Sequence, residues 1–356
     1  MKVTALGSNG RYQLGLLHNE DASKPQDISI PCHGQIVVKQ IANGGNHTLL
    51  LTDQGELYGA GLNTSGQLGF LGNSNMQVGF TKVKVPATQP KFRIVEGGWE
   101  YSVLVDDNGF VYTCGTGSKG ELGLGEGVIN SISPSRENET GHTVTYRLIE
   151  SFPPPGTKIK DVRCGVNHTV VLLSDDTVWG WGASRHGQLG ETSDSIIWKP
   201  RLVFSSKDSD SRIIHISCGR QYTVLGSSNS VYVLGSDKFG VRSNIPRITE
   251  PIRYVGSGWS SIHVHLESGR VLSWGNDSHG QLIPDSGLIF STISVGSEHV
   301  VAVDESGHKV FAWGWGEHGN CGESGLKSDK QISLIWESTS IIKNIFAGQA
   351  NGWIVE

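Results

Sequence analysis

The stretch AWGWGEHGNCGES, at residues 312–324, gathers residue types that could do chemistry. A histidine nitrogen and a cysteine sulfur, here His318 and Cys321, are ligands that zinc prefers. A zinc site needs further ligands, and the remaining cysteines lie far apart with no CxxC pair: Cys32, Cys114, Cys164 and Cys218. We therefore expect no metal site, no cofactor and no disulfide framework, and we expect Cys321 to pack as a small apolar side chain.

Acid–base catalysis is the second possibility for this region. Glu317 and Glu298 are the candidate carboxylates, with His299 next to Glu298 in the sequence. Neither a nucleophile nor a further carboxylate lies at a spacing from them that would indicate a catalytic site. The residues therefore favour a protein that is not an enzyme. The tryptophans Trp313 and Trp315 suggest a third use, a surface that binds another protein.

The chain contains its own control, because the same stretch recurs in altered form. The segment at residues 41–70, IANGGNHTLLLTDQGELYGAGLNTSGQLGF, returns at 162–191 and 254–284, with weaker copies at 95–124, 216–241 and 294–324. A glycine that opens the first turn of each unit marks seven repeats: Gly44, Gly98, Gly165, Gly219, Gly258, Gly296 and Gly348. Alternating runs separated by glycine turns predict about four antiparallel strands in each unit.

Such units cannot bury both of their faces alone, so we expect them to pack radially as an all-β, seven-bladed β-propeller. The last unit, residues 340–356, stops after two runs, and residues 1–16 supply the missing part. This predicts a single domain over residues 1–356, closed by pairing of the N- and C-terminal strands, Val3–Leu16 with the strand that ends at Trp353–Val355. The polar and proline-rich insertion at about 125–158 is expected to be an exposed loop.

Composition excludes several classes of protein. The net charge of −5 and the pI near 6.2 argue against direct binding of nucleic acid, which needs a basic face. No stretch approaches the ~18 apolar residues of a membrane span, and the first residues are too glycine-broken for a signal peptide. We expect a soluble, intracellular protein without membrane contact. Abundant glycine, 48 residues, fits a turn-rich β-protein.

Comparing the repeats separates scaffold residues from candidates for binding. A residue type that returns at one position in several blades is assigned to the scaffold. One such set is the histidines at the start of a strand, His47, His168 and His299. The other is the glutamine or glutamate of the GQLG-type loops: Gln13, Gln67, Glu121, Gln188 and Gln281. By the same test Trp313 and His318 are scaffold, because they match Trp181 and His186.

Departures from the repeat are the candidate partner-binding residues. In the stretch at 312–324, three residues differ from the matching blade. Trp315, Glu317 and Asn320 stand where that blade has Ala183, Arg185 and Gln188. The turn after the marker glycine also varies, and tryptophan and arginine are enriched at interface hot spots. The full set is Trp99, Glu100, Arg220, Trp259, Glu298, Trp315, Glu317 and Asn320. For Trp99 and Trp259 the alternative is that they fill the centre of the propeller.

The repeat "GGNHT…L…G…WGWG…GQLG" resembles that of the regulator of chromosome condensation family of seven-bladed propellers, over essentially the whole chain. Four segments are more specific: GSNGRYQLGL near the start, GSEH at 296–299, WGWGEHGNCG at 313–322 and WIVE at 353–356. They resemble the fungal members of this family that work with the Elongator and diphthamide pathways and whose disruption gives killer-toxin insensitivity.

The resemblance implies a propeller that binds and regulates a small zinc-ribbon electron-carrier protein as a heterodimer, so that the metal belongs to the partner. It implies support for diphthamide synthesis on elongation factor 2 and for Elongator-dependent tRNA wobble-uridine modification, with Elongator as a further partner. The implied location is the cytoplasm, with the nucleus as a second location. The alternative is a guanine-nucleotide exchange factor for a small GTPase. The lack of a basic amino-terminal tail, and of a clear hairpin in the insertion at 125–158, disfavours it.

Overall fold

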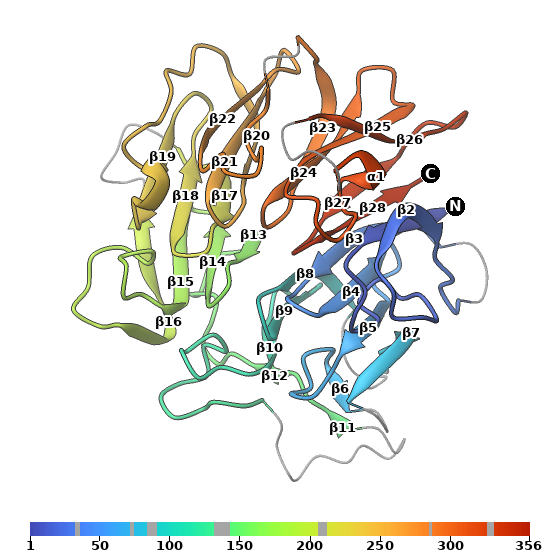
Figure 1. Ribbon diagram of the computed structural model, residues 1–356. Coiled ribbons are helices and arrows are strands. Elements are labelled where there is room, and N and C mark those ends of the chain that lie inside the picture. Colours follow the sequence, from blue (N-terminus) through green and yellow to red (C-terminus); the bar gives the residue numbers. More distant parts are fainter. Residues whose placement is uncertain are drawn as a thin grey trace. The chain divides into compact units, whose positions relative to one another are not determined.

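The regular secondary structure of the described residues is almost entirely β-strand (Figure 1). The computed structural model describes residues 1–32, 36–71, 75–83, 91–131, 143–205, 212–284, 287–325 and 331–356. The helical elements within these residues are the 3-10 turn η2 (Lys238–Gly240) and the short helix α1 (Gly322–Gly325). The strands form seven antiparallel sheets of three or four strands, which are the blades of a β-propeller. The prediction of an all-β, seven-bladed propeller is confirmed.

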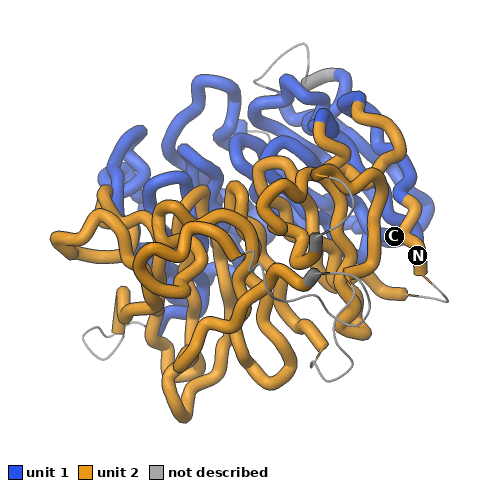
Figure 2. Tube along the Cα trace, turned by 90° about the horizontal axis from the view of Figure 1, so that it is seen from below, with its two compact units in different colours: residues 1–10, 20–28, 209–356 blue, residues 11–19, 29–208 orange. Residues whose placement is uncertain are grey.

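The contacts divide the chain into two compact units (Figure 2). The first unit, residues 1–10, 20–28 and 209–356, carries four blades. Their strands are, blade by blade, β2 (Ala22–Asp27), β1 (Val3–Gly7), β28 (Asn351–Val355) and β27 (Asn344–Ala347); β17 (His215–Cys218), β18 (Tyr222–Gly226) and β19 (Val231–Gly235); β20 (Ile252–Ser257), β21 (Ser261–Leu266) and β22 (Val271–Gly275); β23 (Phe290–Val295), β24 (His299–Asp304), β25 (Lys309–Gly314) and β26 (Ser333–Glu337).

The second unit, residues 11–19 and 29–208, carries three blades and the short pair β6 (Phe70–Leu71) and β11 (Thr143–Val144). The blades are β3 (Val38–Asn43), β4 (His47–Thr52), β5 (Leu57–Leu62) and β7 (Met76–Lys82); β8 (Phe92–Gly97), β9 (Tyr101–Asp106), β10 (Val111–Gly115) and β12 (Arg147–Leu148); β13 (Ile159–Cys164), β14 (His168–Leu173), β15 (Thr177–Ala183) and β16 (Ile196–Ser205). The single domain over residues 1–356 stays a prediction.

The two ends of the chain share one blade. Strand β1 pairs antiparallel with β28, with Val3 opposite Val355 and Ala5 opposite Trp353. Strand β27 pairs with the other edge of β28, and β2 pairs with the other edge of β1. The predicted closure is therefore confirmed, but the pairing strand is shorter than predicted. It ends at Gly7, because residues 8–16 form a GQLG-type loop instead of extended chain.

The second strand of each blade forms the core. In β4, β9, β14 and β21 every residue is buried. A strand covered on both faces needs apolar residues in succession and not in alternation, which explains runs such as HTLLLT. The sequence was expected to alternate here, and the structure corrects this, because neighbouring blades cover both faces.

Two blades in the first unit have three strands in the described chain, β17–β18–β19 and β20–β21–β22, where about four were expected. The marker glycines of these blades lie closer to the next marker than those of the other blades, since only 39 residues separate Gly219 from Gly258. The shorter connection leaves little chain for an outer strand. Two blades therefore end in loops, and one of these loops contains η2.

The insertion at 125–158 differs from the exposed loop expected of it. Residues 132–142, which include most of the segment SRENETGHT, lie outside the described residues. The described part supplies β12, the outer strand of the blade containing β8, β9 and β10. Tyr146, Ile149 and Phe152 are buried, and the Tyr146 ring lies edge-on to Phe92 with 5.7 Å between ring centroids. These apolar side chains anchor the insertion to the core.

Candidate partner-binding surface

The GQLG loops are held by their own glutamine. In four of them the glutamine side-chain oxygen accepts a hydrogen bond from the backbone N–H two residues earlier, at 2.7–3.0 Å, and Glu121 does the same at 2.6 Å. The glutamines concerned are Gln13, Gln67, Gln188 and Gln281. Two of the set also reach the neighbouring blade, since Asn167 donates to Glu121 at 3.0 Å and Gln281 donates to Glu298 at 3.0 Å. The scaffold role expected of these residues is confirmed, but most of the hydrogen bonds lie within the loop and were expected to join strands or blades.

The loop after β25 lacks this glutamine and carries Asn320 in its place. The shorter amide donates to the carbonyl oxygen of Trp315 at 2.8 Å, and its Oδ1 has no hydrogen-bond partner within the described chain. Asn320 is only 1% exposed. It therefore supports the backbone of Trp315 from beneath instead of offering a surface of its own. Cys321 beside it is buried in an apolar cluster, as expected.

Trp315 is the exposed aromatic side chain of this loop, with 39% of its surface accessible. Its indole stacks on the imidazole of His279, with ring centroids 4.7 Å apart and planes 12° from parallel. Its backbone N–H donates to the carbonyl oxygen of Glu298 at 2.9 Å. The tryptophan is thus held outward by a stacked ring and a backbone hydrogen bond, and large aromatic side chains of this kind are typical interface anchors.

Gly314 lets the chain reach this position. It has a φ of 106°, and a Cβ atom built on it would lie 2.4 Å from the carbonyl oxygen of Glu298. An L-residue would be strained by the backbone angle and would also collide with that oxygen. Glycine at this position allows the end of β25 to lie against the turn before β24. This close approach places Trp315 next to that turn.

Glu298 is fixed by two neighbouring side chains. The Ser260 hydroxyl donates to its carboxylate, at 2.7 Å to Oε2, and Gln281 donates to the same oxygen at 3.0 Å. Glu298 is half-buried. A carboxylate has room for about four hydrogen bonds, so it retains capacity to accept from a ligand.

Arg220 and Trp259 form a second part of the surface. The guanidinium carbon of Arg220 lies 5.4 Å from the centroid of the Trp259 ring, a cation–π contact. The backbone N–H of Trp259 donates to the carbonyl oxygen of Ser297 at 2.6 Å, which ties the turn to the next blade. These residues line a pocket of about 300 Å³ together with Glu298.

The same pocket contains residues that the sequence comparison missed, Lys238 and Phe239 of η2. Both side chains are exposed, and the Lys238 ammonium lies 4.9 Å from the centroid of the Phe239 ring. A signal was present in the sequence, because Val241 stands where other blades carry the loop glutamine. The pocket therefore joins Arg220, Trp259 and Glu298 with a loop that departs from the repeat.

Trp99 and Glu100 belong to the second compact unit. Trp99 is half-buried, and a Cβ on Gly45 would lie 2.8 Å from its indole ring. The backbone N–H of Trp99 donates to the carbonyl oxygen of Val166 at 3.2 Å. This packing supports the alternative interpretation of Trp99 as a scaffold residue. Glu100 is exposed, and its backbone oxygen accepts a hydrogen bond from the Thr116 N–H at 2.9 Å.

Glu317 and His318 lie beside Trp315 and are both exposed. Glu317 forms no ion pair or hydrogen bond with any part of the chain that the structure describes. The His318 Nδ1 lies 2.8 Å from the Asp21 carboxylate, a pair in which both side chains are more than 40% exposed. Exposed pairs contribute about 0–1 kcal/mol. His279, at the matching position of another blade, stacks on Trp315. The scaffold role of His318 stays a prediction.

The strand-start histidines are buried and neutral. The His47 Nε2 lies 2.8 Å from the Ser102 hydroxyl, and the His299 Nε2 lies 3.1 Å from the carbonyl oxygen of Asn351. Burial lowers the pKa of both imidazoles to about 4. They are strand-start hydrogen-bonding residues, as expected. Because His299 is only 2% exposed, it offers no accessible base to a reaction.

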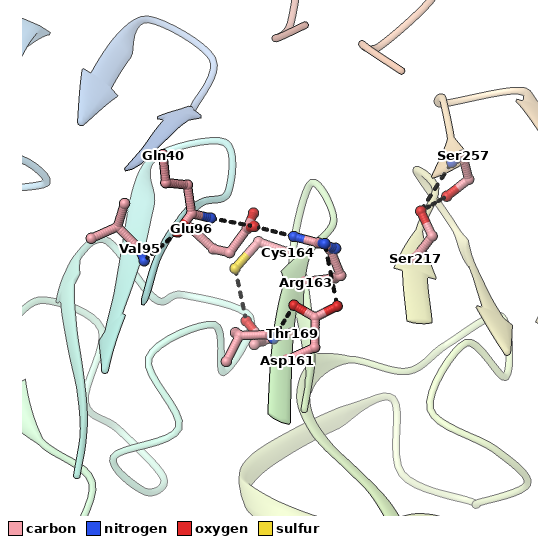
Figure 3. A network of polar contacts seen from close by, with 10 residues as sticks. Gln40, Val95, Glu96, Asp161, Arg163, Cys164, Thr169, Ser217 and Ser257 are labelled. Atoms are coloured by element: carbon pink, nitrogen blue, oxygen red, sulfur yellow. Dashed lines mark hydrogen bonds and ion pairs between the residues drawn. The ribbon is translucent and has the colours of Figure 1, made fainter. Parts of the chain in front are cut away.

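A charged network on the inner strands was also missed by the sequence comparison (Figure 3). Arg163 donates to the Glu96 carboxylate at 2.6 Å and lies 3.2 Å from the Asp161 carboxylate. Gln40 also donates to Glu96, at 3.2 Å. Burial raises the pKa of Glu96 to about 7, although the charge of Arg163 acts in the opposite direction. Burial also raises the pKa of the Cys164 thiol, in keeping with the inert role expected of it.

Within the residues that the structure covers, no three His, Cys, Asp or Glu side chains are grouped so as to hold a metal ion. None of the described helices has the length and hydropathy of a membrane span.

Comparison with known proteins matches the repeat models described as "Regulator of chromosome condensation (RCC1) repeat", one at residues 2–51, 108–172 and 175–225 and another at 38–67 and 159–188. An RCC1 repeat-containing protein of Schizosaccharomyces pombe is 28% identical over 99% of this chain and 98% of its own length. The secretion-regulating guanine nucleotide exchange factor of Bos taurus is 29% identical over 91% of this chain and 76% of its own. The crystal structure of human WBSCR16 superposes with a TM-score of 0.78 at 19% identity, over 100% of this chain and 99% of that one, which supports the fold alone.

Proposed function

Because the chain belongs to the regulator of chromosome condensation repeat family, we propose that it is a non-enzymatic binding protein that regulates a small partner protein. The observation that carries this proposal is Trp315. Its loop departs from the repeat, and His279 of the neighbouring blade stacks on the indole, which has 39% of its surface accessible. An exposed, preorganised tryptophan binds at little entropic cost, since few of its rotamers remain to be lost.

The proposed partner is a small zinc-ribbon electron-carrier protein, bound as a heterodimer. Through it the protein would support diphthamide synthesis on elongation factor 2 and Elongator-dependent tRNA wobble-uridine modification, with Elongator as a further partner, in the cytoplasm and the nucleus. The support is the resemblance of the segments at 296–299 and 313–322 to fungal members of the family, together with a fungal relative that aligns along 99% of the chain.

The test is calorimetric titration of the purified zinc-ribbon protein into the full chain. Trp315→Ala should weaken binding by about 2 kcal/mol, the size of an aromatic hot spot, and leave the melting temperature unchanged. Phe110→Ala is the matched control, because Phe110 is 47% exposed and lies in the turn between β9 and β10. A loss of stability without a loss of binding in Trp315→Ala would make this loop an unusual piece of scaffold.

A second candidate function is nucleotide exchange on a small GTPase, favoured by the name of the bovine relative. The insertion at 125–158 was the candidate for an exchange hairpin. In its described part, β11 pairs with β6 and β12 pairs with β10, so these strands do not pair with each other. We expect catalytic amounts of the protein to leave the release of a fluorescent guanine nucleotide unchanged. A large, dose-dependent acceleration would overturn the main proposal.

A further inference from the structure

The pocket of about 300 Å³ in the first unit has walls of opposite charge. Arg220 and Lys238 supply positive charge, Glu298 supplies negative charge, and Trp259 and Phe239 supply aromatic faces. Arg220 lies in the turn before β18, Trp259 in the turn before β21, and Glu298 in the turn before β24. Three successive blades of the first unit therefore contribute to one recess.

The two cations have no carboxylate partner in the described chain. Some other exposed cations are paired, as in the 3.1 Å contact between Arg253 and Glu267. Arg220 and Lys238 instead lie over aromatic rings, at 5.4 Å and 4.9 Å from the ring centroids. On a chain of net charge −5, this recess carries two cations against one carboxylate, Glu298, and so has a local excess of positive charge. It is complementary to an anionic ligand.

The loop that carries Lys238 is held in an unusual conformation. Phe239 has a φ of 69°, in the left-handed region that bulky residues rarely adopt, and it is 44% exposed. The Asp237 carboxylate accepts the backbone N–H groups of Arg242 at 2.7 Å and Ser243 at 3.0 Å, which fixes the loop without the usual glutamine. Strained backbone of this kind persists where the surrounding structure holds it, and it clusters at binding sites.

Glu298 determines which way a ligand can lie. Its carboxylate is oriented by Ser260 and Gln281 and would repel a second carboxylate placed next to it. It would accept a hydrogen bond from an N–H or O–H group. The recess therefore favours a ligand with an acidic group at one end and a hydrogen-bond donor a short distance away, a description that fits a peptide segment.

We propose that this pocket binds an acidic segment of the partner protein, with a carboxylate side chain between Arg220 and Lys238, an apolar side chain on Trp259 and Phe239, and a backbone N–H at Glu298. The inference rests on the proposed function, because it assigns a second contact to the same partner surface. It names the chemistry of the partner, a segment with acidic and apolar side chains, which Trp315 alone does not.

Fluorescence anisotropy with the full chain and two labelled peptides tests the pocket directly. The acidic peptide EDFDE should bind at least tenfold more tightly than its amide counterpart QNFNQ. The double variant Arg220→Gln/Lys238→Gln should lose at least tenfold in affinity for EDFDE. The control Arg242→Gln/Arg247→Gln removes two exposed charges from outside the pocket and should change the affinity less than twofold.

Equal affinity for the two peptides, or an equal effect of the two double variants, would overturn the proposal. Displacement of EDFDE by inorganic phosphate as readily as by unlabelled EDFDE would also overturn it, since the site would then bind simple anions.

Titration with the zinc-ribbon protein separates the two proposals. If that protein binds the wild type and Arg220→Gln/Lys238→Gln equally, the pocket assignment fails and the proposed function stands. If the zinc-ribbon protein binds neither the wild type nor the double variant while the peptide results hold, the proposed partner is wrong and the pocket assignment stands.

Discussion

At the scale of single residues, burial and not catalysis explains the shifted pKa values of the inner histidines. His47, His263 and His299 are each at most 2% exposed. Burial lowers the pKa of His47 and His299 to about 4 and that of His263 to about 3. Glu96 shifts in the other direction, to about 7. These shifts make the stability of the fold depend on pH.

We expect the free energy of unfolding to fall as the pH drops from 6.5 to 4. In this range the unfolded chain binds protons at these histidines and the folded chain does not, so acid favours unfolding. Each histidine contributes a slope of about 1.4 kcal/mol per pH unit while only the unfolded form is protonated. The raised pKa of Glu96 acts oppositely, stabilising the fold below its unfolded pKa and losing that contribution as the pH rises toward 7.

Urea unfolding at several pH values measures this slope. The variant His299→Gln should reduce the slope by about one proton, because one buried imidazole is removed. His186→Gln is the control, since His186 is exposed at its loop. An unchanged slope in His299→Gln would show that this histidine does not remain neutral in the fold.

At the scale of elements, the end of β25 determines where the candidate surface forms. Gly314 allows close contact between this strand and the turn before β24, and Trp315 is placed by that contact. At Gly314 the neighbouring backbone restricts substitution more than the surrounding side chains do, because the atom closest to an added Cβ would be a carbonyl oxygen.

Gly314→Ala should therefore destabilise the protein by about 2–4 kcal/mol, from a strained φ combined with a steric clash. Gly109→Ala is a matched control. Gly109 also has a positive φ, 86°, but nothing lies within 4 Å of a Cβ built there. We expect about 1 kcal/mol for the control, from the backbone angle alone. Thermal denaturation of both variants decides the matter, and equal losses would contradict the steric argument.

Comparison of the repeats predicted the blades and singled out Trp315, which is exposed, because both depend on local pattern; the binding role of Trp315 stays a prediction. It missed Phe239 because the loop of that blade had lost the glutamine that aligns the others. It missed the pair of Glu96 and Arg163 because these residues are 67 positions apart and meet only when adjacent inner strands pack side by side. Burial of Asn320 was also hidden, since a polar residue in a glycine-rich loop is ordinarily expected to be exposed.

At the scale of the whole molecule, the shared blade joins the two ends of the chain. Besides the pairing of β1 with β28, the N–H of Glu356 donates to Lys2 O at 2.9 Å and the N–H of Lys2 donates to Glu356 O at 3.2 Å. The side chain of Ala5 is fully buried at the centre of this pairing.

Ala5→Pro should destabilise the protein by about 3 kcal/mol or more, because proline removes a backbone donor inside a four-stranded sheet. Deletion of residues 1–16 should have a larger effect, since it leaves one edge of β28 and of β2 without a partner. Differential scanning calorimetry measures both. A deletion mutant that melts as the wild type does would contradict the closure.

The pairing of β1 with β28 also imposes an order of events during synthesis. β1 is made before the strands of the other six blades, but its neighbour β28 is made after them. Until then β1 is an apolar strand with an open edge, available to chaperones or to the wrong strand. A chain that is released before β28 has been made cannot complete this blade, so its β1 keeps one unpaired edge.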